Sequence, residues 1–344
     1  MPFVVRPALA AALLLLVAAC ADAPAPVAAP PPAPKAPAIS LSPRLVEAAS
    51  AYRGYVARAQ AISPNFSDGA GVAQALKTGA GYEPGQLTRG AIAYGAIAAL
   101  QDRAFVAGLQ AYARDPAARR QMAFELLKDP AYARSLSGAS AASALAVAAM
   151  GGEAQRLYDH GKAIKQSAYD VQKASWSRGE VAGRPERLAE VKALSSAVML
   201  GVAAETQRLG DAARGIAPLS FTPADARFTT PAVTRALAIA ALAALGEAGD
   251  ANVDAVLGLT LEPNITGCMT SARLNLNQCL AVARPHYEDL FCTGQHAMMD
   301  TGRCLIRQAG LVEPVEPRFV PDASSIARKM PAPKASTRRP ARKR

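Results

Sequence analysis

The residue types best suited to acid–base chemistry gather in one short stretch near the C-terminal end. The sequence PHYED at 285–289 places an imidazole and two carboxylates within one helical turn, and a further histidine follows at position 296. Histidine and carboxylates this close together can transfer protons or hold a cation. The stretch is also typical of an ordinary helix start, where proline fits the first turn and acids interact favourably with the helix dipole. We favour the helix start and keep as a candidate polar cluster His286, Glu288, Asp289 and His296.

Other catalytic signals are missing from the sequence. It contains no G-x-S-x-G nucleophile elbow, no P-loop, no H-E-x-x-H metal motif and no dinucleotide fingerprint. A carboxylate-pair hydrolase needs only two acids in a cleft, and nothing distinguishes Glu83, Glu125 and Glu153 as candidates. The segment YDH at 158–160 is typical of the polar face of a helix. We expect no cofactor, and we favour a role without catalysis while leaving catalysis open.

Four of the five cysteines lie in one C-terminal segment, at Cys268, Cys279, Cys292 and Cys304. An even number of cysteines in a short segment indicates disulfide bonds if the compartment is oxidising. A zinc site is the alternative, but structural zinc ligands usually come as C-x2-4-C pairs. These cysteines are too dispersed for that pattern, so we expect no metal.

Helical geometry ranks the three connectivities that four cysteines allow. Cys268 and Cys279 are eleven residues apart, which is about 16 Å along a helix and far beyond the roughly 7 Å limit for a disulfide. If the chain folds back near Pro285, one hairpin register brings together Cys279 with Cys292 and Cys268 with Cys304. This nested arrangement resembles the twin-cysteine α-hairpin pattern. We expect a kink in the second arm at positions 301–302.

The fifth cysteine, Cys20, stands where an apolar run gives way to alanine and proline. Arg6 precedes an apolar stretch at 8–17 that is too short to cross a bilayer, which takes about 20 apolar residues. The residues VAAC at 17–20 resemble the lipobox of bacterial lipoprotein precursors. The resemblance implies that the signal at 1–19 is cleaved before Cys20. It also implies that the sulfur receives diacylglyceryl and that the new amino terminus receives a fatty acid such as palmitate.

The same resemblance bears on location. Ala21 follows the cysteine and Asp22 comes one residue later, which implies the outer membrane with the chain facing the periplasm, inner-membrane retention remaining the alternative. Within the predicted linker at 20–40, the eighteen residues after Cys20 are almost all alanine and proline, a composition that forms a semi-rigid spacer of about 3.1 Å per residue. This linker would hold the folded part at most roughly 50 Å from the bilayer.

The formal net charge of +11 is concentrated at the end of the chain. Eight basic residues and no acid follow position 322, and without this tail and Arg6 the body is close to neutral, which argues against nucleic-acid binding. We expect residues 313–344 to be disordered and to bind an anionic partner: peptidoglycan, anionic lipid or an acidic envelope protein. The basic residues are Arg328, Lys329, Lys334, Arg338, Arg339, Arg342, Lys343 and Arg344.

The alanine-rich body predicts a bundle of helices with no sheet. A capping residue followed by proline, which suits a helix start, occurs at Ser42-Pro43, Asp115-Pro116, Asp129-Pro130, Thr222-Pro223 and Thr230-Pro231. Apolar spacing and composition predict helices from Pro43 to about Ile62, then over 88–113, 140–175 with a possible break at 151–152, 185–214 and 231–245. The run at 231–245 contains Arg235 and is short, which favours a buried helix over a membrane span.

These patterns together predict an all-α protein with five parts: a signal at 1–19, a lipidated linker at 20–40, a helical domain at 41–263, a cysteine-rich hairpin at 264–312 and a basic tail at 313–344. The favoured hypothesis for function is a non-enzymatic envelope scaffold or binding protein. The alternatives are a periplasmic hydrolase of peptidoglycan or polysaccharide and a carrier of hydrophobic ligands. Converging acids would favour the hydrolase, a roomy apolar pocket the carrier, and a closed bundle the scaffold.

Overall fold

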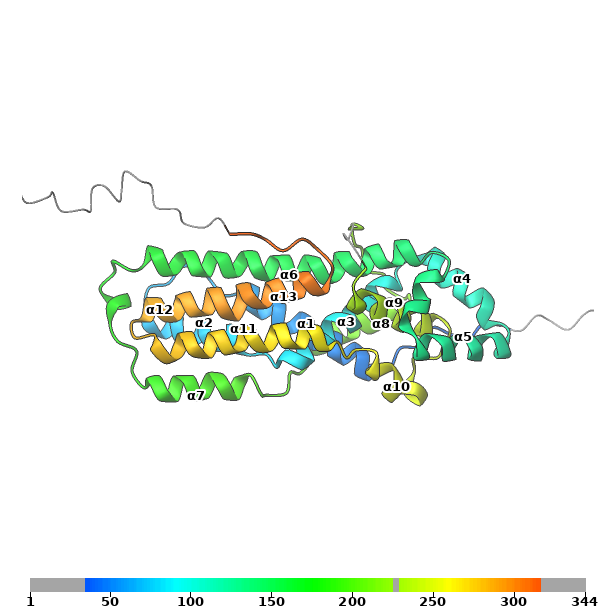
Figure 1. Ribbon diagram of the computed structural model, residues 1–344, viewed down its shortest axis with the longest axis horizontal. Helices are drawn as coiled ribbons and strands as arrows, with labels where there is room; N and C mark the ends of the chain where they lie inside the picture. The colour runs from blue at the N-terminus through cyan, green and yellow to red at the C-terminus, as the bar shows by residue number, and fades with distance from the viewer. Residues whose placement is uncertain (1–34, 225–228, 317–344) are drawn as a thin grey trace, which may run out of the picture. The chain divides into compact units, whose positions relative to one another are not determined.

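The computed structural model describes residues 35–224 and 229–316 (Figure 1). Within these residues the chain forms thirteen α-helices, short 3₁₀ turns and one π-helical segment, and it contains two isolated β-bridges but no strand. The predicted all-α bundle is therefore confirmed. Cys20, the alanine- and proline-rich linker up to residue 34 and the eight basic residues from Arg328 onward lie outside the described residues.

The centre of the bundle is made by four helices: α1 (Pro43–Gln60), α3 (Pro84–Ala99), α6 (Ala139–Asp170) and α9 (Pro231–Ala244). Every residue of α9 from Ala232 to Ala244 is buried except Arg235, so this apolar run is a core helix, as its length predicted. Alanine dominates these helices, which lets their backbones pack closely. No helix among residues 35–224 and 229–316 is both long enough and apolar enough to cross a membrane.

Capping explains where several helices begin. Ser42 and Thr230 accept hydrogen bonds from backbone N–H groups of the first turns of α1 and α9, at 3.3 and 3.1 Å. Asp115 does the same for α5 (Pro116–Lys128), at 2.8 Å. Glutamates act similarly before two further prolines: Glu83 caps α3, and Glu262 caps α11 (Pro263–Val282). A carboxylate at this position satisfies N–H groups that have no helical partner.

Two of the predicted cap–proline starts do not produce α-helices. Asp129-Pro130 opens a 3₁₀ turn, Pro130–Ser135. No helix begins at Thr222-Pro223, because the described chain there is held by contacts with other helices. The Phe221 ring packs edge-on against Tyr94 at 6.1 Å, and the N–H of Ala224 donates to the carbonyl of Ala144.

The predicted helix over 88–113 is two helices. The chain leaves α3 after Ala99, and Asp102 caps α4 (Arg103–Ala113) by accepting from the N–H of Phe105 at 2.7 Å. The predicted helix over 185–214 is also divided, into α7 (Arg184–Leu194) and α8 (Ala203–Ala213). Side chains of α1 hold the connecting segment open, since Glu47 accepts from Gly201 and Ser50 accepts from Val202. These tertiary hydrogen bonds override local helix propensity.

The long helix predicted over 140–175 is α6, and it runs through Gly151-Gly152 without a break. Gly151 lies against Leu311, so that a side chain at this position would overlap the leucine. The glycine therefore serves packing and not a bend.

The C-terminal helices form the predicted disulfide-braced hairpin. Its first arm is α11, and its second arm is α12 (His286–Cys292), the π-helical segment Thr293–Asp300 and α13 (Thr301–Gln308). Disulfides join Cys268 to Cys304 and Cys279 to Cys292, with Cα separations of 5.8 and 5.7 Å. These are the pairs that the hairpin register favoured.

The second arm is irregular at the π-helical segment Thr293–Asp300, just before positions 301–302, where a kink was expected. A π-helix bonds each residue to the fifth along the chain and places more residues in a turn. The segment Thr293–Asp300 therefore lets a step of twelve positions from Cys292 to Cys304 match a step of eleven from Cys268 to Cys279. Helix continues through Thr301-Gly302 into α13.

The second arm meets the backbone of α6 at Gly294. A Cβ atom built at Gly294 would lie 2.7 Å from the carbonyl oxygen of Gly161, against backbone that cannot move aside cheaply. We expect Gly294→Ala to lower the free energy of unfolding by about 1–3 kcal/mol through overpacking. Gly267→Ala, in α11 with nothing within 4 Å, is the matched control and should raise it by about 0.5–1 kcal/mol. Urea denaturation of both variants measures the difference, and similar midpoints for the two would contradict the close contact.

Candidate functional site

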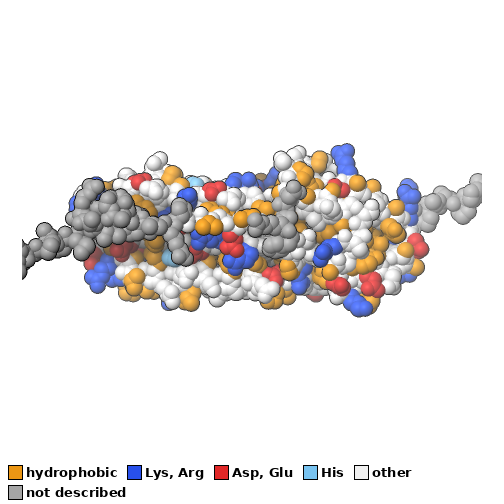
Figure 2. All heavy atoms as spheres, turned by 45° about the horizontal axis from the view of Figure 1, so that its top comes forward, with side chains coloured by type: hydrophobic (Ala, Val, Ile, Leu, Met, Phe, Trp, Pro, Cys, Tyr) orange, Lys and Arg blue, Asp and Glu red, His pale blue; other side chains and the backbone are white. Residues whose placement is uncertain are grey.

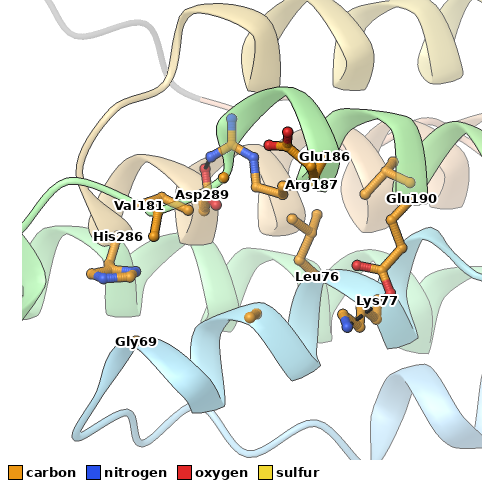
Figure 3. Close-up of a pocket in the computed structure, with 13 residues that line it drawn as sticks. Gly69, Leu76, Lys77, Val181, Glu186, Arg187, Glu190, His286 and Asp289 are labelled. Atoms are coloured by element: carbon orange, nitrogen blue, oxygen red, sulfur yellow. Dashed lines mark hydrogen bonds and ion pairs between the residues drawn. The ribbon is translucent and has the colours of Figure 1, made fainter.

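A pocket of about 500 Å³ lies between α2 (Gly69–Ala80), α7 and the start of α12 (Figure 3). Two members of the candidate polar cluster, His286 and Asp289, line it. Residues from α2 and from the segment 181–191 supply the other walls. The complete lining is Gly69, Ala73, Leu76, Lys77, Val181, Ala182, Gly183, Glu186, Arg187, Glu190, Val191, His286 and Asp289.

His286 is placed by the turn that precedes α12. Its N–H donates to the carbonyl of Gly179 at 3.3 Å, while the N–H of Val181 donates to the carbonyl of Arg284 at 2.8 Å. These two hydrogen bonds join the segment before α7 to the segment before α12. The imidazole lies against Gly69, where any Cβ would come within 2.6 Å of Nε2. The absence of a side chain at the start of α2 therefore makes room for the ring.

A buried ion pair forms the inner wall of the pocket. Arg187 of α7 donates to Asp289 of α12 at 2.5 Å, with side-chain exposures of 10% and 2%. Arg187 also donates to the carbonyl of Leu280 in α11, while its Nε is buried without a hydrogen-bond partner. Burial raises the pKa of Asp289, and the Arg187 guanidinium opposes this effect. The pair links three helices, so its first role is to position them.

The outer wall carries charges of both signs. Lys77 of α2 pairs with Glu190 of α7 at 2.8 Å, and both side chains are nearly half exposed. Figure 3 shows this pair on the opposite side of the pocket from His286, with Leu76 between them. Leu76 and Val191 give the floor an apolar surface. A ligand in the pocket would meet cations, carboxylates and aliphatic side chains together.

The other two members of the candidate cluster lie elsewhere. Glu288 accepts a hydrogen bond from the N–H of Arg284 at 2.8 Å, within the turn before its own helix. His296 lies in the π-helical segment and is bonded to Asp300 at 2.8 Å. Burial tends to raise the pKa of Asp300, but hydrogen bonds from His296 and Gln295 outweigh it and the pKa is lowered. Of the four residues, only His286 and Asp289 therefore lie together, and Glu288 and His296 each bind a group in their own segment.

The three glutamates considered as catalytic acids come from three different places in the fold. Glu83 binds the N–H groups of Gly85 and Gln86 as the cap of α3. Glu125 of α5 accepts from Gln121, and Glu153 of α6 is buried between Arg53 and Arg156. Each carboxylate already has polar partners. His160, from the segment YDH, is bonded to the carbonyl of Ile62 at 2.7 Å.

The pocket brings charged groups of both signs beside an imidazole. Its lining contains acids, bases and a histidine but no serine, threonine or cysteine to act as a nucleophile. In the part of the chain that the structure describes, no group of three or more His, Cys, Asp or Glu side chains is arranged to hold a metal. Lys77, Glu186, Arg187 and Glu190 were not singled out from the sequence, since they lie about a hundred residues or more from His286 and show no motif.

Comparison with known proteins adds no relative to this description. No protein-family model, curated protein or solved structure matches the chain. The fold and site therefore define the chain by its own features: an all-α bundle, a C-terminal hairpin braced by two disulfides, and a pocket of mixed charge beside that hairpin.

Proposed function

We propose that this protein is a lipid-anchored lipoprotein of the periplasmic face of the outer membrane that serves as a non-enzymatic scaffold. Its lipid, on Cys20, would hold the folded body at the membrane, and its basic tail would bind an anionic partner of the envelope. The lipobox-like residues VAAC at 17–20 support the anchor. The two disulfides support an oxidising compartment, because such bonds rarely persist where thiols are kept reduced.

The observation that carries the scaffold proposal is the separation between the two ends of the described chain. Residues 35–41 run beside the end of α9 and the turn that follows it. The backbone N–H of Ser40 donates to the carbonyl of Ala243, and the backbone N–H of Ser42 donates to the carbonyl of Ala248. Arg119 of α5 pairs with Glu247 of the same turn at 2.9 Å. The chain that would follow a lipid anchor therefore enters beside α5.

The C-terminal end of the described chain is held near the other end of α6. Glu316, the last described residue, pairs with Lys165 at 2.9 Å. Helix α6 begins at Ala139, close to α4 and the 3₁₀ turn Pro130–Ser135. From Ala139 to Lys165 the helix rises about 39 Å, at 1.5 Å per residue. Figure 1 shows α6 running along the bundle between these two regions. A rigid helix thus separates the proposed anchor end from the start of the tail.

The interior of the bundle supports a scaffold over a carrier. Helices α3 and α9 are buried along most of their length by side chains, and a second pocket, of about 840 Å³, opens at the surface between α1 and α10 (Val253–Gly258) and not between these two helices. The separated, partnered carboxylates of Glu83, Glu125 and Glu153 give no support to a carboxylate-pair hydrolase. Within this proposal, the helical domain 41–263 is the spacer and the hairpin 264–312 braces it near the tail.

Deleting residues 323–344 is expected to leave the helical body folded and to weaken binding to peptidoglycan sacculi. The eight cations removed interact with wall carboxylates, and added salt should weaken the intact protein's binding through screening. Co-sedimentation with purified sacculi at low and high salt measures the effect. The matched control keeps the tail length and replaces its arginines and lysines by glutamine, which should bind as weakly as the deletion. Binding that is unchanged by either variant, or indifferent to salt, would contradict the proposal.

A further inference from the structure

We propose that the surface formed by α4, α5 and the turn Pro130–Ser135, here called the α4–α5 face, docks on a membrane surface that carries anionic phosphate headgroups. This inference rests on the proposed lipid anchor, which sets the direction from which the tether arrives and favours a membrane as the occupant. It assigns to the folded body a second, weaker membrane contact. That contact would orient the bundle with α6 leading away from the bilayer.

A stripe of α5 has the composition expected for such a contact. Arg120, Phe124 and Lys128 follow one another at four-residue spacing and are all exposed, so they lie along one side of the helix. Phe124 is 58% exposed, and the Lys128 ammonium lies 5.9 Å from the centre of its ring. Because more than half of the Phe124 side chain is exposed, packing in the core does not explain why an aromatic residue occupies this position.

Two exposed tyrosines lie on the neighbouring elements. Tyr112, near the end of α4, is 57% exposed, and Tyr132, in the 3₁₀ turn, is 38% exposed. Aromatic side chains with one polar end are enriched where headgroups meet hydrocarbon. Figure 2 shows hydrophobic, basic and acidic side chains interspersed over the end of the bundle where Figure 1 places α4 and α5.

The charge of the α4–α5 face is positive although the body as a whole is nearly neutral. Between positions 103 and 134 there are six arginines and lysines and three acids. Asp115 and Asp129 bind backbone N–H groups as helix caps, and Glu125 accepts from Gln121. Arg119 pairs with Glu247. In the described part of the chain, five cations of this face pair with no acid: Arg103, Arg114, Arg120, Lys128 and Arg134.

The position of the tether selects a membrane as the occupant. Residues 35–41 reach the bundle beside the turn that Arg119 joins to α5, so a lipid on Cys20 would draw this end toward the bilayer. The fifteen residues from Cys20 to Lys35 reach at most about 46 Å when extended. Cations alone would be enough to bind an anionic wall polymer. The exposed phenylalanine and tyrosines favour a lipid interface instead.

A fluorescence reporter on the α4–α5 face tests this docking separately from the lipid anchor and the tail. The protein used is the chain from residue 20 to 344 with Cys20→Ser, so that no lipid is attached, and with Trp176→Phe. One version carries Phe124→Trp on α5 and the other Leu274→Trp on α11, where the native leucine is 54% exposed. Each is mixed with vesicles of phosphatidylglycerol and phosphatidylcholine, with vesicles of phosphatidylcholine alone, and with soluble peptidoglycan fragments.

The expected result is a blue shift of the tryptophan emission at position 124 with the anionic vesicles and none at position 274. Arg120→Ser and Lys128→Ser should each lower the vesicle affinity about fivefold. The charge-matched controls Lys173→Ser and Lys192→Ser, also exposed, should leave the affinity unchanged.

Three results would overturn the inference. If the protein sediments with vesicles but the reporter at 124 does not shift, the tail alone binds. If both reporters shift, the contact is not confined to the α4–α5 face. If peptidoglycan fragments and not vesicles shift the reporter at 124, the face binds wall polymer. None of these results bears on whether Cys20 carries lipid, because no protein in the experiment is lipidated.

Discussion

Replacing Arg187 by methionine is expected to lower the free energy of unfolding by about 3–5 kcal/mol. The side chain of Asp289 is 2% exposed, and Arg187 is its only ion-pair partner among the described residues. Removing the guanidinium leaves a nearly buried carboxylate without its cation, and a buried unpaired charge is among the most costly defects in a protein. The hydrogen bond from Arg187 to Leu280, which ties α7 to α11, is lost as well.

The loss should depend on pH with a definite sign. Burial already raises the pKa of Asp289, and without Arg187 this effect is opposed only by the weaker influence of His286. A carboxyl whose folded pKa lies above its unfolded value favours folding when protonated, and this contribution is lost as pH rises through the folded pKa. The variant should therefore be most destabilised near neutral pH and should approach the native protein as pH falls.

Urea unfolding at neutral and at mildly acidic pH measures this effect. Two variants serve as controls. Asp289→Asn added to Arg187→Met removes the stranded charge without changing its shape, and should recover part of the loss at neutral pH. Lys77→Met breaks the Lys77–Glu190 pair of the same pocket, and should cost no more than about 1 kcal/mol because both partners are nearly half exposed. Equal losses for Arg187→Met and Lys77→Met would contradict the distinction between inner and outer wall.

Removing either disulfide is the second large effect. The bond between Cys268 and Cys304 closes a loop with a sequence separation of 36, and that between Cys279 and Cys292 one of 13. Cross-links that close longer loops restrict the unfolded chain more. We expect paired serine substitutions to cost about 4 kcal/mol for the outer bond and about 3 kcal/mol for the inner bond.

Thermal unfolding of the two double variants, beside the native protein with and without reductant, measures these contributions. The reduced native protein should be less stable than either variant, since it lacks both bonds. Nonreducing peptide mapping is the control, and should recover Cys268 joined to Cys304 and Cys279 joined to Cys292. Four free thiols, a bridge between Cys268 and Cys292, or unchanged stability on reduction would contradict the braced hairpin.

The sequence predicts the parts of the fold that local chemistry decides. Ser42, Asp115 and Thr230 cap the helices that they were expected to cap, because a short polar side chain before proline satisfies N–H groups of its own first turn. The hairpin register is likewise determined by spacing alone. The π-helical segment also had a signal in the sequence: the second arm has one more residue between its cysteines than the first.

Tertiary contacts decide the features that the sequence does not predict. The gap between α7 and α8 exists because Glu47 and Ser50, on α1, bind backbone N–H groups more than 150 residues away. The pocket depends in the same way on Arg187 meeting Asp289, a contact between helices that no short motif records. Of the residues suggested as a polar cluster, His286 and Asp289 share this pocket, whereas Glu288 and His296 bind groups in their own segments.

The state of Cys20 tests the proposed anchoring most directly, because the scaffold role and the orientation of the α4–α5 face both assume it. The measurement is the mass of the N-terminal peptide of the protein extracted from membranes of the cells that produce it. We predict a peptide that begins at Cys20 and carries diacylglyceryl on sulfur and a fatty acyl group on nitrogen, and a Cys20→Ala variant that retains residues 1–19. An unmodified N-terminal peptide, together with normal cleavage and release of the Cys20→Ala variant in soluble form, would contradict the account.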